Sequence, residues 1–204
     1  MMTIVDYGLG NISAFLNVYR RSNIDARTAA TPGELKGATR IILPGVGSFD
    51  HAMTQLQRSG MRETLDDLVL NRRVPVLGVC VGMQMLGRSS DEGALPGLGW
   101  IGGSVTRLAT LIGDQALPLP HMGWNDVRVV SRDPLFDALD ADARFYFLHS
   151  YYFACDRPED ALALASYGRE FACAVHAGNV YGVQFHPEKS HRWGTRLLHN
   201  FARL

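Results

Sequence analysis

The sequence predicts an α/β fold: one mixed sheet with helices on both faces, parallel in the first half of the chain and antiparallel in the second. Up to Leu86, short apolar runs alternate with stretches of helical periodicity, the β-α pattern of a parallel sheet. From Trp100 onward, strand-like runs follow one another, and turns such as residues 177–179 favour antiparallel hairpins. We therefore expect residues 1–204 to form one domain.

Four strands are predicted in the first half, because each is a mainly apolar run that ends in turn residues. They cover Thr3–Tyr7, Asp25–Ala29, Arg40–Leu43 and residues 74–80. The third is followed by Pro-Gly-Val-Gly, so it ends abruptly at the same sheet edge as the fourth.

Helices are predicted between these strands from their caps and their periodicity. Asn11 can cap a helix whose apolar residues follow helical spacing. Thr31 opens a capping box with a proline at the first helical position. Two further helical stretches cover residues 48–58 and 60–73.

The second half begins with a glycine-rich loop at residues 90–99 and continues with short predicted strands. A last helix over Arg192–Leu204 carries apolar residues at helical spacing and is expected to pack on the sheet. The strands cover residues 100–108, 124–130, 145–153, 161–167, 171–176 and 180–185.

The bulk composition is that of an ordinary globular protein, with 47% hydrophobic and 20% charged residues in a chain of 204. Basic and acidic residues number 20 each, so the formal charge is +0. The sequence has no basic stripe of the kind that would indicate a nucleic-acid partner. Residues 1–10 lack the features of a signal peptide, and no apolar run has membrane-spanning length. We therefore expect a soluble cytoplasmic protein that binds neither nucleic acid nor membrane.

Residues 74–86 join a buried strand to a helix through a Gly-x-Cys-x-Gly sequence centred on Cys80. This pattern is typical of a nucleophile elbow, a sharp turn that lifts the central side chain into solvent. The free N–H groups and positive dipole end of the following helix would lower the pKa of the thiol. The alternative is a structural cysteine, which is how we interpret Cys155 and Cys173, since three widely spaced cysteines suggest neither disulfides nor zinc.

A reactive cysteine needs a base and a group that orients the base. His186 ends a strand-like run, and Glu188 lies two residues later, an offset that can direct both side chains to one side of an extended chain. Pro187 cannot donate to a neighbouring strand, so the sheet should end there. Cys80, His186 and Glu188 are therefore a candidate triad. The alternatives are a solvated turn, or a metal site through His186, Glu188 and His191, whose spacing matches no standard zinc pattern.

Acyl transfer also needs hydrogen-bond donors for an oxyanion. The N–H of Val81, directly after the cysteine, is one candidate. Val46 or Gly47 is the other, because the neighbouring strand ends there and glycine allows peptide orientations forbidden to other residues. An ordinary strand-to-helix loop is the alternative.

With these residues assembled, the sequence resembles the class I (triad) glutamine amidotransferases, and among them the glutaminase subunits of imidazole glycerol phosphate synthase. The resemblance implies a flavodoxin-like fold without cofactor or metal. It also implies hydrolysis of glutamine to glutamate and ammonia, with Cys80 as nucleophile, His186 as proton shuttle and Glu188 orienting it. Gln84 and the backbone around His149, Ser150 and Tyr151 match positions that hold the glutamine. The segments that carry the resemblance are Ile4–Asn11, Leu43–Phe49, Leu77–Leu86, Pro120–Asn125, Phe147–Tyr152 and Tyr181–Ser190.

The resemblance further implies a heterodimer with a (β/α)8-barrel cyclase subunit, which receives the ammonia and makes imidazole glycerol phosphate in histidine biosynthesis. Asn11, Trp124 and Lys189 match positions near that interface, and partner binding is implied to activate the glutaminase through the peptide at residues 46–47. The family commonly has leucine in place of Val81, whose N–H is unaffected by the change.

Residues 11–24 and 97–108 look more like paralogues that supply ammonia to a barrel partner aminating a nucleotide-linked sugar for surface polysaccharide. In that alternative the glutaminase chemistry is the same and the ammonia acceptor differs. A catalytically idle regulatory subunit and a cysteine hydrolase with the same elbow are further alternatives.

Overall fold

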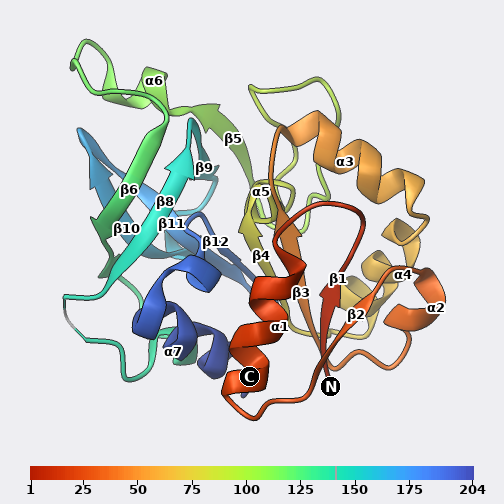
Figure 1. The fold of residues 1–204 in the computed structure, drawn as a ribbon. Helices are drawn as coiled ribbons and strands as arrows, with labels where there is room; N and C mark the ends of the chain where they lie inside the picture. The colour runs from red at the N-terminus through yellow and green to blue at the C-terminus, as the bar shows by residue number, and fades with distance from the viewer. Residues whose placement is uncertain (141) are drawn as a thin grey trace.

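The computed structural model describes residues 1–140 and 142–204. In these residues an eight-stranded mixed sheet, ordered β2-β1-β3-β4-β12-β11-β10-β7, forms the centre of the molecule (Figure 1). The first-half strands pair in parallel, as predicted, and the α/β class is confirmed. The strands are β1 (Met2–Val5), β2 (Ala26–Ala29), β3 (Arg40–Gly45), β4 (Val76–Cys80), β7 (Arg128–Val129), β10 (Ala161–Tyr167), β11 (Arg169–Ala177) and β12 (Val180–Val183).

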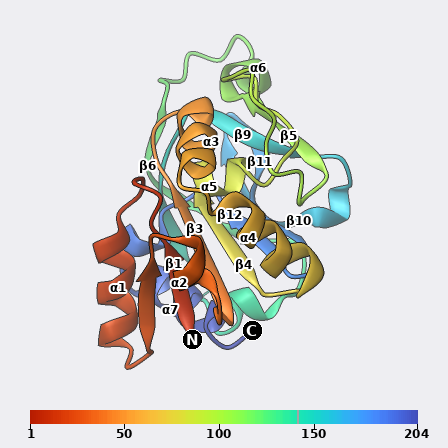
Figure 2. The same cartoon turned by 90° about the vertical axis from the view of Figure 1, so that its right-hand side faces the viewer.

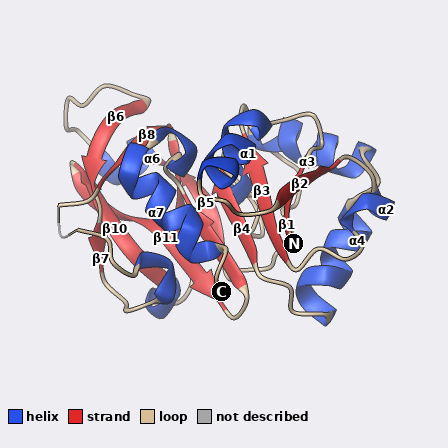
Figure 3. Cartoon of the chain, turned by 60° about the horizontal axis from the view of Figure 1, so that its bottom comes forward, coloured by secondary structure: helices blue, strands red, loops and turns tan. Residues whose placement is uncertain are grey.

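Helices cover both faces of this sheet. α1 (Ile12–Arg21) contacts α7 (His191–Phe201), and Figure 2 shows α1 on one side of the parallel strands and α4 (Arg62–Asp66) on the other. Figure 3, with helices in blue and strands in red, shows the same layered arrangement. The remaining described helices are α2 (Pro32–Leu35), α3 (Phe49–Arg58), α5 (Val81–Gln84) and α6 (Leu108–Ile112).

The predicted helix caps are confirmed. The side chain of Asn11 accepts a hydrogen bond from the N–H of Ala14 at 3.2 Å. Thr31 forms the capping box with Glu34: its Oγ1 accepts from the Glu34 N–H at 3.4 Å, and the Glu34 carboxylate accepts from the Thr31 N–H at 3.1 Å. Both helices therefore begin where their local sequence satisfies the free N–H groups.

Several predicted elements are wrong in extent. The predicted strand 145–153 is two strands on either side of Ser150, because the chain there leaves one two-stranded sheet and enters another. The apolar residues on both sides hide this change, since burial in either sheet selects the same residue types. The two sheets pair β8 (Arg144–His149) with β6 (His121–Asp126), and β9 (Tyr151–Cys155) with β5 (Gly103–Arg107).

Three other predicted elements also differ. The predicted strand 124–130 is divided between β6 and β7, and the predicted strand 100–108 ends before Leu108, which begins α6. The predicted helix 60–73 is α4 followed by a π-helical turn over Asp67–Asn71. Apolar periodicity alone did not resolve these boundaries.

The prediction that the second half of the chain is antiparallel throughout is wrong at β12. This strand forms an antiparallel hairpin with β11, but its other edge pairs in parallel with β4, from Val180 opposite Val76 to Val183 opposite Val79. The residues that follow β12 are therefore held beside the residue that ends β4, which is Cys80.

The hydrophobic core fills the space between the sheet and its helices. α1 contributes Phe15 and Tyr19, and α7 contributes Leu197, Leu198 and Phe201, each at most 1% exposed. Of the helices in the described residues, none is both long enough and apolar enough to cross a membrane.

Gly82 packs α5 against β3 so closely that no side chain fits. A Cβ at this position would lie 2.0 Å from the carbonyl oxygen of Leu43. The carbonyl oxygen belongs to the backbone and cannot rotate away, so a side chain at this position would force α5 to move. We therefore expect Gly82→Ala to lower the free energy of unfolding by about 3 kcal/mol, measured by urea denaturation. Gly33→Ala is the control, because a Cβ there meets nothing within 4 Å. Equal stability of the two variants would contradict this packing.

Candidate active site

The elbow at the end of β4 places Cys80 in a strained backbone conformation. Its φ is 56° and its ψ is −116°, a region that residues other than glycine rarely occupy. Such conformations cost about 1–3 kcal/mol and cluster at functional sites. The prediction that the elbow lifts the side chain into solvent is wrong, because Cys80 is only 5% exposed. The thiol instead lies in a recess shared with residues from other segments.

The helix that follows is shorter than its sequence suggests. α5 ends at Gln84, so it is about one turn long, and residues 85–87 continue as hydrogen-bonded turns. A dipole of one turn is a weak influence on the thiol. The charged neighbour that the structure does provide is His186.

His186 links Cys80 to Glu188. It lines the same cavity as Cys80, and its Nδ1 lies 2.9 Å from Oε1 of Glu188. The side chains of His186 and Glu188 are 5% and 2% exposed, so water screens their interaction poorly. Backbone bonds hold the ring in place: the His186 N–H donates to Tyr146, and its carbonyl accepts from Ser190. The structure thus brings the three residues of the predicted triad together.

This environment favours the protonated imidazole. Burial by itself would lower the pKa of His186, but the hydrogen bonds and charges of Cys80 and Glu188 outweigh it and raise that pKa to about 9. Around neutral pH the ring therefore holds a proton in the cavity that it shares with Cys80.

Replacing Glu188 should shift the pH dependence of the site. In the wild-type chain, kcat/KM is expected to fall as pH rises through about 9, because the proton on His186 is then lost. Glu188→Gln removes the negative charge that raises this pKa, so the alkaline fall should move to lower pH by at least about one unit. We also expect about a 10²-fold loss in rate near neutrality, because the ring is no longer oriented. A pH–rate profile with an unmoved alkaline limb would contradict this role.

Around Cys80 lies a cavity of about 300 Å³ at the carboxyl ends of β3 and β4. The predicted oxyanion and substrate residues line it, together with His186 and Lys189. Glu188 does not line the cavity and contacts Nδ1 of His186. The cavity is lined by Val46, Gly47, Cys80, Val81, Gln84, Glu92, Pro120, Leu148, His149, Ser150, Tyr151, His186 and Lys189.

Gln84 is held on two sides. Its Nε2 donates to the carbonyl oxygen of Tyr151 at 3.3 Å and to Oε1 of Gln184 at 3.0 Å. Gln184 in turn has its Nε2 3.9 Å from the sulfur of Cys80. Sequence reasoning missed Gln184 as a site residue, because its place between β12 and His186 indicated only a strand.

Glu92 is a second residue that the sequence did not single out. Among the described residues that line the cavity, it carries the one carboxylate. Its Oε2 accepts from the N–H of Phe49 at 2.8 Å, which holds the loop 90–99 against the start of α3. One acidic residue in a polar loop gives no sequence signal, and only folding brings it near Cys80.

The three residues assigned to a partner interface lie at different places. Asn11 caps α1. Trp124 is 38% exposed and stacks on His191, with ring centroids 5.2 Å apart. Lys189 lines the cavity, with its Nζ 5.8 Å from the ring centroid of Tyr146. Their interface role stays a prediction.

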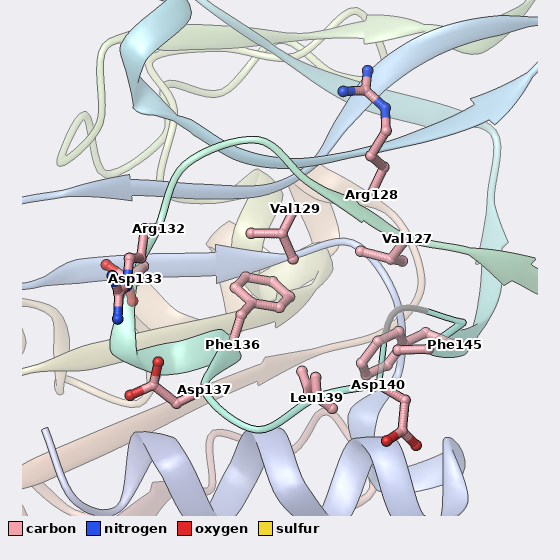
Figure 4. Close-up of a pocket in the computed structure, with 11 residues that line it drawn as sticks. Val127, Arg128, Val129, Arg132, Asp133, Phe136, Asp137, Leu139, Asp140 and Phe145 are labelled. Atoms are coloured by element: carbon pink, nitrogen blue, oxygen red, sulfur yellow. The ribbon is translucent and has the colours of Figure 1, made fainter.

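A larger cavity of about 390 Å³ lies between β7 and the segment that follows it (Figure 4). Its lining includes apolar side chains such as Val129 and Phe136 and charged side chains such as Arg128, Arg132 and Asp137. None of the predicted site residues lines it, and its described lining carries no cysteine or histidine. The chemistry therefore belongs to the cavity at Cys80.

Comparison with known proteins gives relatives over the full length. Residues 4–204 match the family model described as "Glutamine amidotransferase class-I". The chain is 60% identical to imidazole glycerol phosphate synthase subunit HisH of Bdellovibrio bacteriovorus, covering 100% of both chains. It is 50% identical to the same subunit of Leptospira borgpetersenii, again over 100% of both. A crystal structure of a glutamine amidotransferase, 19% identical, has a TM-score of 0.76 and covers 100% of this chain and 99% of its own, a likeness of fold.

Proposed function

The chain belongs to the class-I glutamine amidotransferases and, among them, to the HisH subunits of imidazole glycerol phosphate synthase; from this premise we propose that it hydrolyses glutamine to glutamate and ammonia. The observation that carries the proposal is the placement of Cys80 and His186 in the lining of one cavity of about 300 Å³, with Glu188 paired to Nδ1 of His186. A cavity of this size suits an amino acid rather than a macromolecule.

In the first half-reaction the Cys80 thiolate attacks the side-chain amide carbon of glutamine. A C–S bond forms, and the carbonyl oxygen becomes an oxyanion. Val81 lies in the first turn of α5, so its N–H has no acceptor within the helix and is free to stabilise this charge. Val46 and Gly47 line the same cavity and are proposed to supply the second donor. His186 then gives its proton to the amide nitrogen, the C–N bond breaks and ammonia leaves.

In the second half-reaction the glutamyl thioester is hydrolysed. His186, now neutral, takes a proton from water, and the hydroxyl group attacks the thioester carbon. The C–S bond breaks, which releases glutamate and restores the thiolate beside a protonated ring. Glu188 holds the Nδ1 side of the ring throughout, so the other nitrogen faces the sulfur.

The lining also suggests how glutamine is recognised. We propose that the carboxylate of Glu92 pairs with the α-ammonium group of the substrate. Gln84, fixed by Tyr151 and Gln184, and the peptide around Ser150 would position the rest of the molecule.

As in the synthase whose subunits it resembles, the chain is proposed to pass ammonia to a (β/α)8-barrel cyclase, which makes imidazole glycerol phosphate. Asn11, Trp124 and Lys189 are proposed to face this partner. Support comes from the exposed aromatic ring of Trp124 and from Lys189 at the cavity. The relatives of Bdellovibrio bacteriovorus and Leptospira borgpetersenii are both named for imidazole glycerol phosphate synthase, which favours the histidine pathway.

The test supplies glutamine labelled with ¹⁵N in its side-chain amide to the complex with the cyclase and its nucleotide substrate. We expect glutamate and ¹⁵N-labelled imidazole glycerol phosphate to form in equal amounts, and we expect no turnover of asparagine. Labelled glutamine that yields no glutamate in this complex would overturn the glutaminase function. If glutamate forms but the ¹⁵N appears in an aminated nucleotide-linked sugar and not in imidazole glycerol phosphate, only the assignment of the ammonia acceptor would be overturned.

A further inference from the structure

Two buried histidines outside the triad lie against each other beside the active-site cavity. β6 and β8 pair so that His121 stands opposite His149, and Nδ1 of His121 lies 2.9 Å from Nε2 of His149. They are 3% and 5% exposed. The hydrolysis described above uses neither ring.

The direction of each hydrogen bond in this cluster is set at both ends by backbone carbonyls. The carbonyl of Tyr151 can only accept, so Nδ1 of His149, 2.8 Å away, carries the proton and Nε2 accepts. His121 must therefore donate from Nδ1, which leaves its Nε2 as the acceptor for Nδ2 of Asn125, 3.2 Å away. At the other end, the same Nδ2 donates to the carbonyl of Ser166 at 2.8 Å, which fixes the Asn125 amide in that orientation.

Both rings are neutral in this arrangement. A second proton on His149 would face the donor of His121 across 2.9 Å, and a second proton on His121 would face Nδ2 of Asn125 across 3.2 Å. Burial works in the same direction and lowers the pKa of His121 to about 4 and that of His149 to about 3. His121 is further fixed by stacking between Phe147 and Tyr167, with centroids 4.9 Å and 4.2 Å from its own.

The cluster ends at a group that shapes the substrate site. The Tyr151 carbonyl that His149 holds also accepts from Nε2 of Gln84, and both residues line the cavity. Because both nitrogens of His149 are occupied, its ring is not free to hydrogen-bond glutamine. The ring supports Tyr151 and Gln84, and the predicted contact with glutamine through the backbone around His149 is left open by this arrangement.

We propose that His121 is a positioning residue for glutamine: by donating to Nε2 of His149 it stabilises the tautomer whose Nδ1 holds the Tyr151 carbonyl, and so keeps that carbonyl and the Gln84 amide where the substrate needs them. The proposal rests on the glutaminase function argued above.

Two variants separate the hydrogen bond from the packing of the ring. His121→Phe keeps an aromatic ring between Phe147 and Tyr167 but removes the donor to His149. His121→Asn loses the ring but keeps an amide N–H near the place of Nδ1. In the complex with the cyclase, we expect His121→Phe to raise KM for glutamine about tenfold with kcat within about twofold, and His121→Asn to keep KM within about threefold. A purely structural role would affect the ring-losing Asn variant more than the Phe variant.

The tautomer of His149 is a readout that does not depend on activity. Two-bond ¹H–¹⁵N correlation spectra of the full chain should show His149 protonated on Nδ1 in the wild type and in His121→Asn, and a mixture of tautomers in His121→Phe. Wild-type His149 protonated on Nε2, or an unchanged KM in His121→Phe, would overturn the proposal. A wild-type complex that releases no glutamate would instead overturn the glutaminase function, and the spectra would still decide the tautomer.

Discussion

Cys80→Ala is expected to reduce the release of glutamate from glutamine by at least about 10⁴-fold, because without the sulfur no thioester can form. The measurement is glutamate production by the complex with the cyclase at saturating glutamine. Alanine is smaller than cysteine and meets no new neighbour in the buried recess, so binding of glutamine should survive while turnover is lost.

The control is Cys155→Ala, which removes a half-buried cysteine from β9, outside the cavity lining. It should retain activity within about twofold, since substitutions away from functional features have small effects. Retention of more than about one per cent of wild-type activity by Cys80→Ala would contradict a covalent mechanism at this residue.

His186→Gln is expected to reduce glutamate release by about 10³-fold, because the sulfur loses the proton acceptor that activates it and the leaving ammonia loses its proton donor. The thiol should also react more slowly with a neutral alkylating agent near pH 7, since a thiolate no longer has an imidazolium partner. This second readout separates loss of activation from loss of glutamine binding.

His51→Gln is the matched control, because His51 is exposed on α3 and does not line the cavity. It should leave both the rate and the alkylation of Cys80 unchanged. If His186→Gln kept its activity within about tenfold of the wild type, another group would have to be the base.

The parts of the site that sequence could predict are those with a local physical signature. The glycines at 78 and 82 mark the elbow because α5 approaches β4 at Gly78 and β3 at Gly82 too closely for a side chain to fit. The two-residue offset between His186 and Glu188 predicted that both side chains lie on one side of an extended chain. Their atoms do lie 2.9 Å apart, but the backbone there is a 3-10 turn over Pro187–Lys189 and is not extended. Asn11 and Thr31 marked helix starts through their own capping bonds.

What sequence could not supply depends on pairing between distant segments. No local pattern shows that β12 pairs in parallel with β4, although this pairing brings His186 beside Cys80. Glu92 reaches the cavity through a loop held on the N–H of Phe49. The hydrogen-bond roles of His149 follow from its place opposite His121 in a two-stranded sheet that periodicity did not distinguish from its neighbour.

The most direct test of Cys80 as the nucleophile uses a glutamine analogue with an electrophilic chloroketone in place of the amide. Incubated with the complex, it should label one residue per chain, which peptide mapping places at Cys80. Excess glutamine should prevent the labelling, and His186→Gln should slow it. Labelling at Cys155 or Cys173 instead, or an unlabelled Cys80 in a complex that still releases glutamate, would contradict the assignment.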